Sequence, residues 1–368
     1  MQMKKTIYIL AALFLMSCSG SNEGPEIPDA YTAPFTLSAD KQEVEADGVS
    51  VVTFSLKDNY GRELLDDRSV MPYISISSAG GVKVPRLSRT VSFLDNGEFE
   101  FVARYDGKES ANKVTVRSVN RGSYEMFHKN IGIFKCTSVN CPACPGLVQS
   151  FRTISDYSRS HCVLLAFHGH FTGTDPFAEV SGSLSGYIMS EFGLDVWPSG
   201  VFDMRDPFKG AISSSDMEKN IESLRIGNPA TCGIKVNSIT SDGNNVKVNA
   251  SLKSSKGGEY DLACALVADG LRYEGGNSYQ DSGIYDEVVL AASDNFMRYD
   301  RDRLTSVTAG GEMTSDIIMT FSGQVSENDL NGKYIAVWAY RKTDDGGSVM
   351  DNIVTCSFGS TTEYVLNE

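Results

Sequence analysis

The stretch that decides the fold of the middle of this chain is KNIGIFKCTSVNCPACPGLVQSFRTISDYSRSHCVLLAFH, residues 129–168. A short apolar run at 129–136 is followed by apolar residues at helical spacing over 145–160, and then by a second, continuous apolar run at 162–168. Continuous apolar strands are typical of parallel sheets that are covered on both faces. The stretch therefore predicts a strand–helix–strand unit with two parallel strands.

Three cysteines, Cys136, Cys141 and Cys144, lie around the start of the predicted helix. A Cys-x-x-Cys pair at a helix start supports redox chemistry, because the unpaired N–H groups and the helix dipole stabilise a thiolate on the first cysteine. We therefore expect Cys141 to be the attacking thiolate and Cys144 the shielded resolving thiol. Pro142 suits this position, since the first helical turn can spare a backbone donor.

Redox exchange is favoured for this pair, and a permanent structural disulfide or a zinc site are the alternatives. Zinc is disfavoured because structural zinc sites use a second Cys-x-x-Cys or Cys/His pair, and only an improvised set of Cys136, Cys141, Cys144 and His168 is available. We expect Cys136 beside the Cys141/Cys144 loop, either as a third exchange partner or as a competing partner for Cys141. Cys162 is predicted to be a buried core thiol. No metal and no cofactor is predicted.

Two histidines, His168 and His170, follow the second predicted strand, at the sheet edge where the cysteine loop is also expected. A protonated imidazole at His168 would lower the pKa of Cys141. Together with Asp175, the histidines are also candidates for a metal site. Ordinary loop residues before a helix remain the favoured interpretation of this group.

The N-terminus, MQMKKTIYILAALFLMSC, has two lysines and then ten apolar residues before Ser17 and Cys18, which is the layout of a secretory signal. The apolar run is too short for a membrane-spanning helix. Leu15-Met16-Ser17-Cys18 resembles a bacterial lipobox. That resemblance implies a signal peptide at 1–17 and a lipid on Cys18. The segment that follows is small, polar, acidic and interrupted by prolines, which predicts a flexible tether at 18–32. A soluble secreted protein is the alternative.

The composition limits the classes of partner. With 368 residues, 41% of them hydrophobic, the chain is long enough for two or three domains. A net charge of -14 argues against nucleic-acid binding.

Seven of the eight cysteines remain if Cys18 carries lipid, so at least one thiol is free or intermolecular. Among Cys232, Cys264 and Cys356 we predict one disulfide and one thiol, with Cys264 and Cys356 as candidate partners.

Strand-rich segments flank the central unit. Alternating apolar residues separated by turns predict an antiparallel β-sandwich at 33–122 and a second antiparallel β domain at 229–368. The first includes ADGVSVVTFSLKDNYGREL, residues 46–64, which resembles bacterial immunoglobulin-like repeats of the adhesin type. The resemblance implies an immunoglobulin-like spacer or interaction module.

The central segment, 123–228, resembles the thioredoxin fold, since Cys-Pro-Ala-Cys opens the first helix and Trp197-Pro198 precedes a third strand. This resemblance implies an α/β thioredoxin-like domain in which Pro198 is a cis-proline set against the dithiol, with Trp197 covering it. The lipobox, the HGHFTGTDPF loop at 168–177 and YDLACALVADGL at 260–271 together resemble Bacteroidetes outer-membrane lipoproteins related to the twenty-eight-kilodalton outer-membrane protein.

The sequence thus predicts a multidomain, lipid-anchored protein of the outer membrane that carries out thiol–disulfide exchange on a protein substrate. The site residues are Cys141, Cys144, Pro198 and His168, and the lipid is attached at Cys18. The alternative is a non-catalytic surface interaction or adhesion protein that uses its β-sandwiches, with the thioredoxin-like core as a scaffold. Whether the chain is an enzyme depends on this choice.

Overall fold

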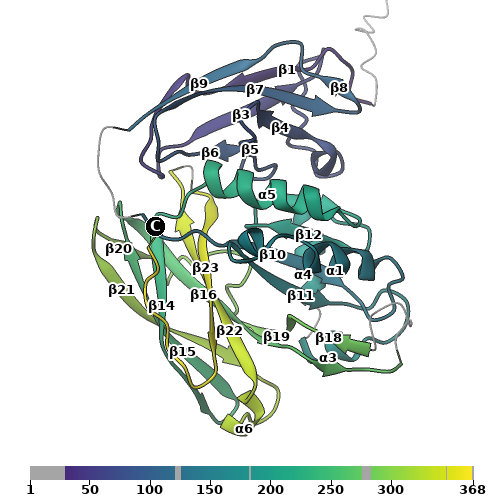
Figure 1. Ribbon diagram of the computed structural model, residues 1–368, viewed down its shortest axis with the longest axis vertical. Helices are drawn as coiled ribbons and strands as arrows, with labels where there is room; N and C mark the ends of the chain where they lie inside the picture. The colour runs from purple at the N-terminus through teal and green to yellow at the C-terminus, as the bar shows by residue number, and fades with distance from the viewer. Residues whose placement is uncertain (1–29, 121–125, 182–183, 276–282, 345, 367–368) are drawn as a thin grey trace, which may run out of the picture.

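The computed structural model describes residues 30–120, 126–181, 184–275, 283–344 and 346–366. The predicted signal peptide, Cys18 and most of the predicted tether lie outside these residues. Within the described part of the chain, none of the helices combines the length and the apolar character needed to cross a membrane. The protein is a mixed α/β structure, consisting mostly of strands in several sheets (Figure 1).

The N-terminal region consists of two sheets that enclose one core. The first contains β1 (Thr36–Ala39), β3 (Val52–Lys57) and β6 (Thr90–Val91). The second contains, in sheet order, β2 (Glu43–Glu45), β9 (Val114–Val119), β7 (Gly97–Tyr105), β4 (Ser75–Ser78) and β5 (Lys83–Val84), with β8 (Lys108–Glu109) paired to β7 and a short helix, η1 (Met71–Tyr73), outside it.

Alternating side chains from these two sheets form the core, in which the rings of Phe54 and Phe101 lie 4.8 Å apart. Period-two alternation is visible in β3, where every second residue is buried. The strand pairs are antiparallel, as predicted, except that β2 and β9 run parallel.

A nine-stranded sheet forms the centre of the molecule (Figure 1). Its strands, in sheet order, are β13 (Asp206–Lys209), β12 (Ser199–Phe202), β10 (Ile131–Thr137), β11 (Cys162–His168), β19 (Val288–Ala292), β16 (Gly258–Ala268), β22 (Lys333–Lys342) and β23 (Ser348–Ser357), with β20 (Thr305–Val307) paired to β16. The strands β10 and β11 are parallel, with Ile131 beside Cys162 and Cys136 beside Phe167. The predicted parallel pair is therefore confirmed.

Helices cover both faces of this part of the sheet. On one face, α1 (Cys144–Arg152) and α5 (Ser214–Gly227) pack on Ile131 and Ile133 of β10. On the other face, α4 (Leu184–Phe192) packs on Phe134 and Cys136. Both faces of β10 are consequently apolar, which explains why its sequence is an almost continuous hydrophobic run. Shorter helices α2 (Asp156–Arg159) and α3 (Pro176–Ser181) lie in the connections.

The C-terminal region continues the same sheet. Ala166 of β11 pairs in parallel with Val288 of β19, so the sheet crosses the domain boundary expected between residues 228 and 229. A second sheet consists of β14 (Cys232–Asp242), β15 (Asn245–Ser254) and β21 (Glu312–Thr320). It encloses a core with residues of β16, β22 and β23. The remaining elements are the pair β17 (Leu271–Arg272) and β18 (Ile284–Tyr285), and α6 (Glu327–Leu330).

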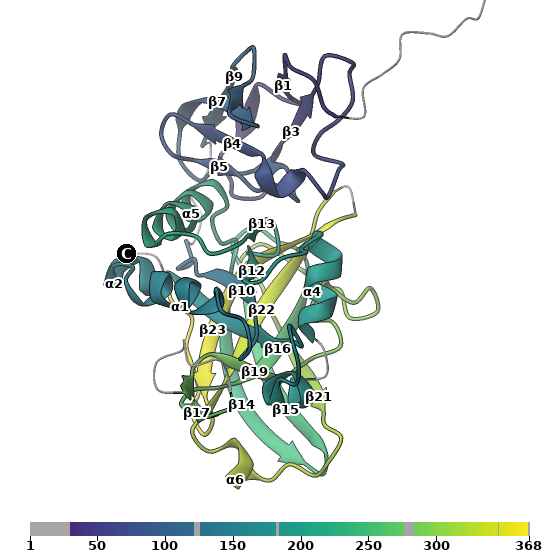
Figure 2. The same ribbon diagram turned by 90° about the vertical axis from the view of Figure 1, so that its right-hand side faces the viewer.

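The N-terminal sheets lie against the edge of the central sheet at β13 and α5 (Figure 1 and Figure 2). Buried Asp206 of β13 forms ion pairs with Lys83 (2.5 Å) and Arg86 (2.7 Å) of the N-terminal region. The backbone N–H of Leu87 also donates to the carbonyl of Arg205 at 2.6 Å. The contact between the N-terminal region and the central sheet therefore contains ion pairs and a backbone hydrogen bond.

Candidate functional site

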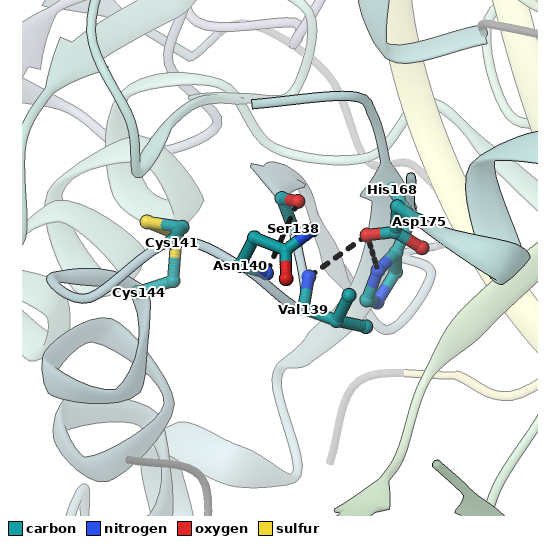
Figure 3. The surroundings of a disulfide bond; sticks show 7 residues. All are labelled: Ser138, Val139, Asn140, Cys141, Cys144, His168 and Asp175. Atoms are coloured by element: carbon teal, nitrogen blue, oxygen red, sulfur yellow. Dashed lines mark hydrogen bonds and ion pairs between the residues drawn. A yellow bond between two sulfur atoms is a disulfide. The ribbon is translucent and has the colours of Figure 1, made fainter. Parts of the chain in front are cut away.

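The candidate site is the loop that joins the end of β10 to the start of α1, where Cys141 and Cys144 form a disulfide with Cα atoms 5.4 Å apart (Figure 3). Both cysteines are buried, Cys141 with 2% of its surface exposed and Cys144 with none. The two residues between them, Pro142 and Ala143, are exposed. A partner therefore reaches the exposed turn of this loop more readily than its sulfur atoms.

Helix α1 begins at Cys144, three residues later than the sequence suggested. Cys141 and Pro142 belong to a turn before the helix, in which the N–H of Cys141 donates to the carbonyl of Ser138 at 3.1 Å. The turn forms because Pro145 occupies the first helical turn, where a residue without an N–H is tolerated, and Cys144 can then start the helix. The helix N-terminus is thus closest to the resolving cysteine rather than to Cys141.

One carboxylate holds this loop in place. Asp175 accepts hydrogen bonds from the N–H of Val139 (2.8 Å), the N–H of Phe177 (2.9 Å) and Nδ1 of His168 (2.9 Å). Nearby, the side-chain amide of Asn140 donates to the carbonyl of Thr174 at 2.9 Å. Burial alone would raise the pKa of Asp175, but these hydrogen bonds hold it below its usual value.

His168 is buried at the end of β11 and is directed toward Asp175 rather than toward the cysteines. Figure 3 shows Val139 and Asn140 between the disulfide and this His168–Asp175 pair. Burial lowers the pKa of His168, with Asp175 opposing the shift, so the ring is neutral near pH 7. This geometry does not provide the expected imidazolium beside Cys141. His168 instead contacts the cysteine loop through Asp175.

His170 is the other histidine that was considered for a metal site, and its position is also explained by local contacts. His170 is exposed, and its Nδ1 accepts a long hydrogen bond, 3.3 Å, from the N–H of Asp175. Among the residues that the structure describes, no group of three or more His, Cys, Asp or Glu side chains is arranged to hold a metal ion.

The Trp197–Pro198 peptide bond is cis, as the family resemblance implied. Pro198 is buried and leads into β12, whose Ser199 lies beside Cys136 near the end of β10. The chain on either side of Pro198 is therefore next to the strand from which the cysteine loop leaves. Trp197 contacts Gly169, where there is no room for a Cβ atom, and its ring lies 6.2 Å from that of Phe171. These contacts place Trp197 against the 169–171 loop, and its expected position over the disulfide stays a prediction.

The expectation that Cys136 competes for Cys141 is wrong, because Cys136 is a free thiol. Alternate residues of a strand face opposite sides, and Cys136 points into the core that α4 covers, away from α1. Its Sγ donates weakly to the carbonyl of Ser185 at 3.9 Å, and burial raises its pKa.

Among the described residues, Cys162, Cys232, Cys264 and Cys356 are free as well. The predicted disulfide among Cys232, Cys264 and Cys356 is wrong, since all three are free thiols. The candidate partners Cys264 and Cys356 are kept apart because β22 lies between β16 and β23. Two strand spacings separate them by about 9.5 Å, more than the ~7 Å between Cα atoms that a disulfide spans. Cys232 is a buried thiol of β14. Cys162 is only half-buried, because it lies at the very start of β11.

The sequence did not single out Lys135 and Glu287. Lys135 is 3% exposed on β10, and Glu287 lies just before β19. Burial lowers the pKa of Lys135 and raises that of Glu287, and each residue opposes the shift of the other. A lysine inside an otherwise apolar strand was the only available sign of this pair. The position of Glu287 depends on the pairing of β19 with β11, which local sequence does not reveal.

Comparison with known proteins identifies a similar fold but no family. No family model and no curated protein matches the chain. The solved structure of HBP35 of Porphyromonas gingivalis is similar with a TM-score of 0.50 and 12% identity, over 67% of this chain and 86% of that one. The structure of protein AGR_C_4864 from Agrobacterium tumefaciens has a TM-score of 0.39 and 18% identity, over 66% of this chain and 98% of that one. At these identities, the likeness to HBP35 describes the fold alone.

Proposed function

We propose that the chain is a thiol–disulfide exchange protein with a thioredoxin-like domain at 123–228. The observation that carries the proposal is the Cys141–Cys144 disulfide at the junction of β10 and α1, beside the segment that contains Pro198. The sheet order β13-β12-β10-β11, with β10 and β11 parallel and helices on both faces, supports the same assignment.

In the proposed reaction, a thiolate of a protein dithiol attacks Sγ of Cys141. The bond between Cys141 and Cys144 breaks, a mixed disulfide forms, and Cys144 leaves as a thiolate. The second substrate thiolate then attacks the substrate sulfur of the mixed disulfide, and Cys141 leaves. The substrate loses two electrons to the cysteine pair, which becomes a dithiol after taking up two protons. The reverse sequence reduces a substrate disulfide.

The test is the midpoint potential of the cysteine pair in the purified fragment that begins after the predicted tether. The fraction of reduced protein is measured by alkylation and mass spectrometry across a glutathione series. Exchange activity predicts a midpoint between roughly -120 and -270 mV, the range of known oxidoreductases. Cys136→Ser should leave the midpoint unchanged, and Cys141→Ser should abolish the transition. A pair that stays oxidised at the reducing end of the series contradicts the proposal.

A second candidate function is non-catalytic interaction or adhesion through the β-rich regions, including an immunoglobulin-like N-terminal domain. The 2% exposure of Cys141 favours it, because a substrate thiolate must reach that sulfur for exchange to occur. In that case the disulfide is structural and resists glutathione. The same titration therefore separates the two functions.

We also propose that the chain is held at the outer membrane by a lipid on Cys18. This rests on the lipobox-like Leu15-Met16-Ser17-Cys18 after a basic and apolar start. Metabolic labelling with a fatty acid should mark the wild-type protein, and Cys18→Ala should remove both the label and the membrane fractionation. Labelling that survives Cys18→Ala contradicts this anchor.

A further inference from the structure

A cavity of about 620 Å³ lies where the N-terminal region, α4 and β22 meet. Leu87 of the N-terminal region, Phe192 of α4 and Tyr340 of β22 all line it. The described residues of its lining include none of the four predicted residues of the redox site. A cavity of this volume at the meeting point of several regions is typical of sites that bind small molecules.

One part of the lining is apolar. Phe192, Met204 and Tyr340 are almost completely buried there, and Leu87 and Met297 are half-buried. The hydroxyl of Tyr340 is used inside the protein, since it donates to a backbone carbonyl at 2.6 Å. This part of the lining therefore offers mainly carbon surface, which is suited to the apolar body of a ligand.

Two exposed arginines, Arg298 and Arg301, also line the cavity. Within the described part of the chain, neither guanidinium group forms a hydrogen bond or an ion pair. A guanidinium group is planar and presents several N–H donors, which match the oxygens of a carboxylate or a similar anionic group. The two side chains are thus available to an anionic ligand.

The carboxylates around the cavity do not cancel these charges. Glu191 forms an ion pair with Arg68 at 3.5 Å, and Asp300 forms one with Arg303 at 3.4 Å. Among the described residues, Asp294 is the one carboxylate of the lining without an ion pair. Two unpaired arginines against one unpaired carboxylate leave a local positive charge, in a chain with a net charge of -14.

The loop that carries the arginines is held in place by a buried carboxylate. Asp261 of β16, which is 2% exposed, accepts hydrogen bonds from the side-chain amide of Asn295 (2.7 Å) and the backbone N–H of Asp300 (2.7 Å). These two bonds fix the loop on both sides of Arg298. Little further ordering of the backbone is therefore needed when a ligand binds.

We propose that this cavity binds an organic anion with an apolar body. Its anionic group bonds to Arg298 and Arg301, and its apolar body lies against Phe192 and Met297. Asp294 repels the anion and so limits the affinity. The proposal is independent of thiol–disulfide exchange, because the cysteine pair is not part of the lining.

The experiment titrates the purified protein with two fluorescent probes that share an aromatic body. Anilinonaphthalene sulfonate is an anion, and phenylnaphthylamine lacks the sulfonate group. The wild type should bind the anionic probe more tightly. The double change Arg298→Gln and Arg301→Gln should weaken the anionic probe by about tenfold, the effect of losing one charged hydrogen-bonded contact, and leave the neutral probe unchanged. Arg104→Gln, at an exposed arginine of β7 outside the cavity, should match the wild type with both probes.

Two further variants separate the charged contacts from the apolar ones. Asp294→Asn removes the repelling carboxylate and should strengthen binding of the anionic probe alone, by about threefold. Met297→Ser should weaken both probes equally, by about fivefold, because both lose the same apolar contact.

Equal affinity of the anionic probe for the wild type and the double arginine variant overturns the proposal. If the double variant loses both probes through a change in the shape of the cavity, Asp294→Asn decides. Stronger binding of the anionic probe alone in that variant supports the proposal, and unchanged binding overturns it.

Discussion

At the scale of single residues, the position of the cysteine loop depends on one buried carboxylate. Asp175 bonds to the backbone of Val139 in the loop, to the backbone of α3 at Phe177 and to the ring of His168. A buried carboxylate with this many donors is well satisfied, and breaking one of its bonds leaves a buried polar group without a partner. His168 therefore stabilises the loop while it stays neutral.

The neutral state of His168 predicts a pH dependence. Its pKa is lowered by burial in the folded protein, so between that pKa and 6.5 the unfolded chain binds more protons than the folded one. The free energy of unfolding should thus fall as pH decreases below about 6.5, by at most about 1.4 kcal/mol per pH unit. Urea denaturation from pH 7.5 to 5 measures this. His168→Asn, which retains a donor for Asp175, should remove this part of the slope, whereas the matched change at exposed His170 should not. Equal slopes in all three proteins contradict the prediction.

At the scale of elements, the strand–helix–strand unit follows from local patterns. The continuous apolar runs predicted β10 and β11, and the helical spacing after Pro145 predicted α1. The start of α1 was less predictable, because Pro142 and Pro145 are each compatible with a first helical turn.

Strand β12 approaches β10 closely at Gly200, where an added Cβ atom would collide with the backbone oxygen of Phe134 and the ring of Phe208.

Gly200→Ala should therefore destabilise the sheet beside the candidate site. The backbone of β10 cannot move aside without disturbing its neighbours, so we expect a loss of about 2–3 kcal/mol in the free energy of unfolding. Gly186→Ala on the exposed face of α4 is the control, since a Cβ atom there meets nothing within 4 Å. It should be neutral or stabilising by up to ~1 kcal/mol. Thermal or urea unfolding measures both, and an unchanged stability in Gly200→Ala contradicts the close approach.

At the scale of the whole molecule, the N-terminal, central and C-terminal regions are structurally connected. The central sheet runs from β13 to β23 and so includes strands from both sides of the expected boundary at 228/229. The N-terminal region is attached through Asp206, a buried carboxylate between Lys83 and Arg86. Burial would raise the pKa of Asp206, but Arg86 and Lys83 hold it below its usual value.

Asp206→Asn should weaken this connection between regions. Removing one member of a buried ion pair leaves the partner cations unpaired, at a cost of about 3 kcal/mol. We expect the N-terminal region to unfold at lower temperature than the rest, as a separate transition in scanning calorimetry and as earlier cleavage in limited proteolysis. Glu109→Gln, which breaks an exposed pair with Arg104, should change stability by less than about 1 kcal/mol. A single unshifted transition in Asp206→Asn contradicts the inferred role.

The sequence by itself determined the features that depend on neighbours along the chain: the parallel β10–β11 pair, the alternating strands of the terminal regions, and a Cys141–Cys144 spacing that a disulfide can close. It could not determine which face each side chain would meet, because that depends on strands distant in sequence. The pairing of β11 with β19 brings Glu287 toward Lys135, and the insertion of β22 separates Cys264 from Cys356. Tertiary structure also decided that His168 bonds to Asp175. Burial favours the neutral imidazole ring of His168, and the fold places the carboxylate of Asp175 beside it.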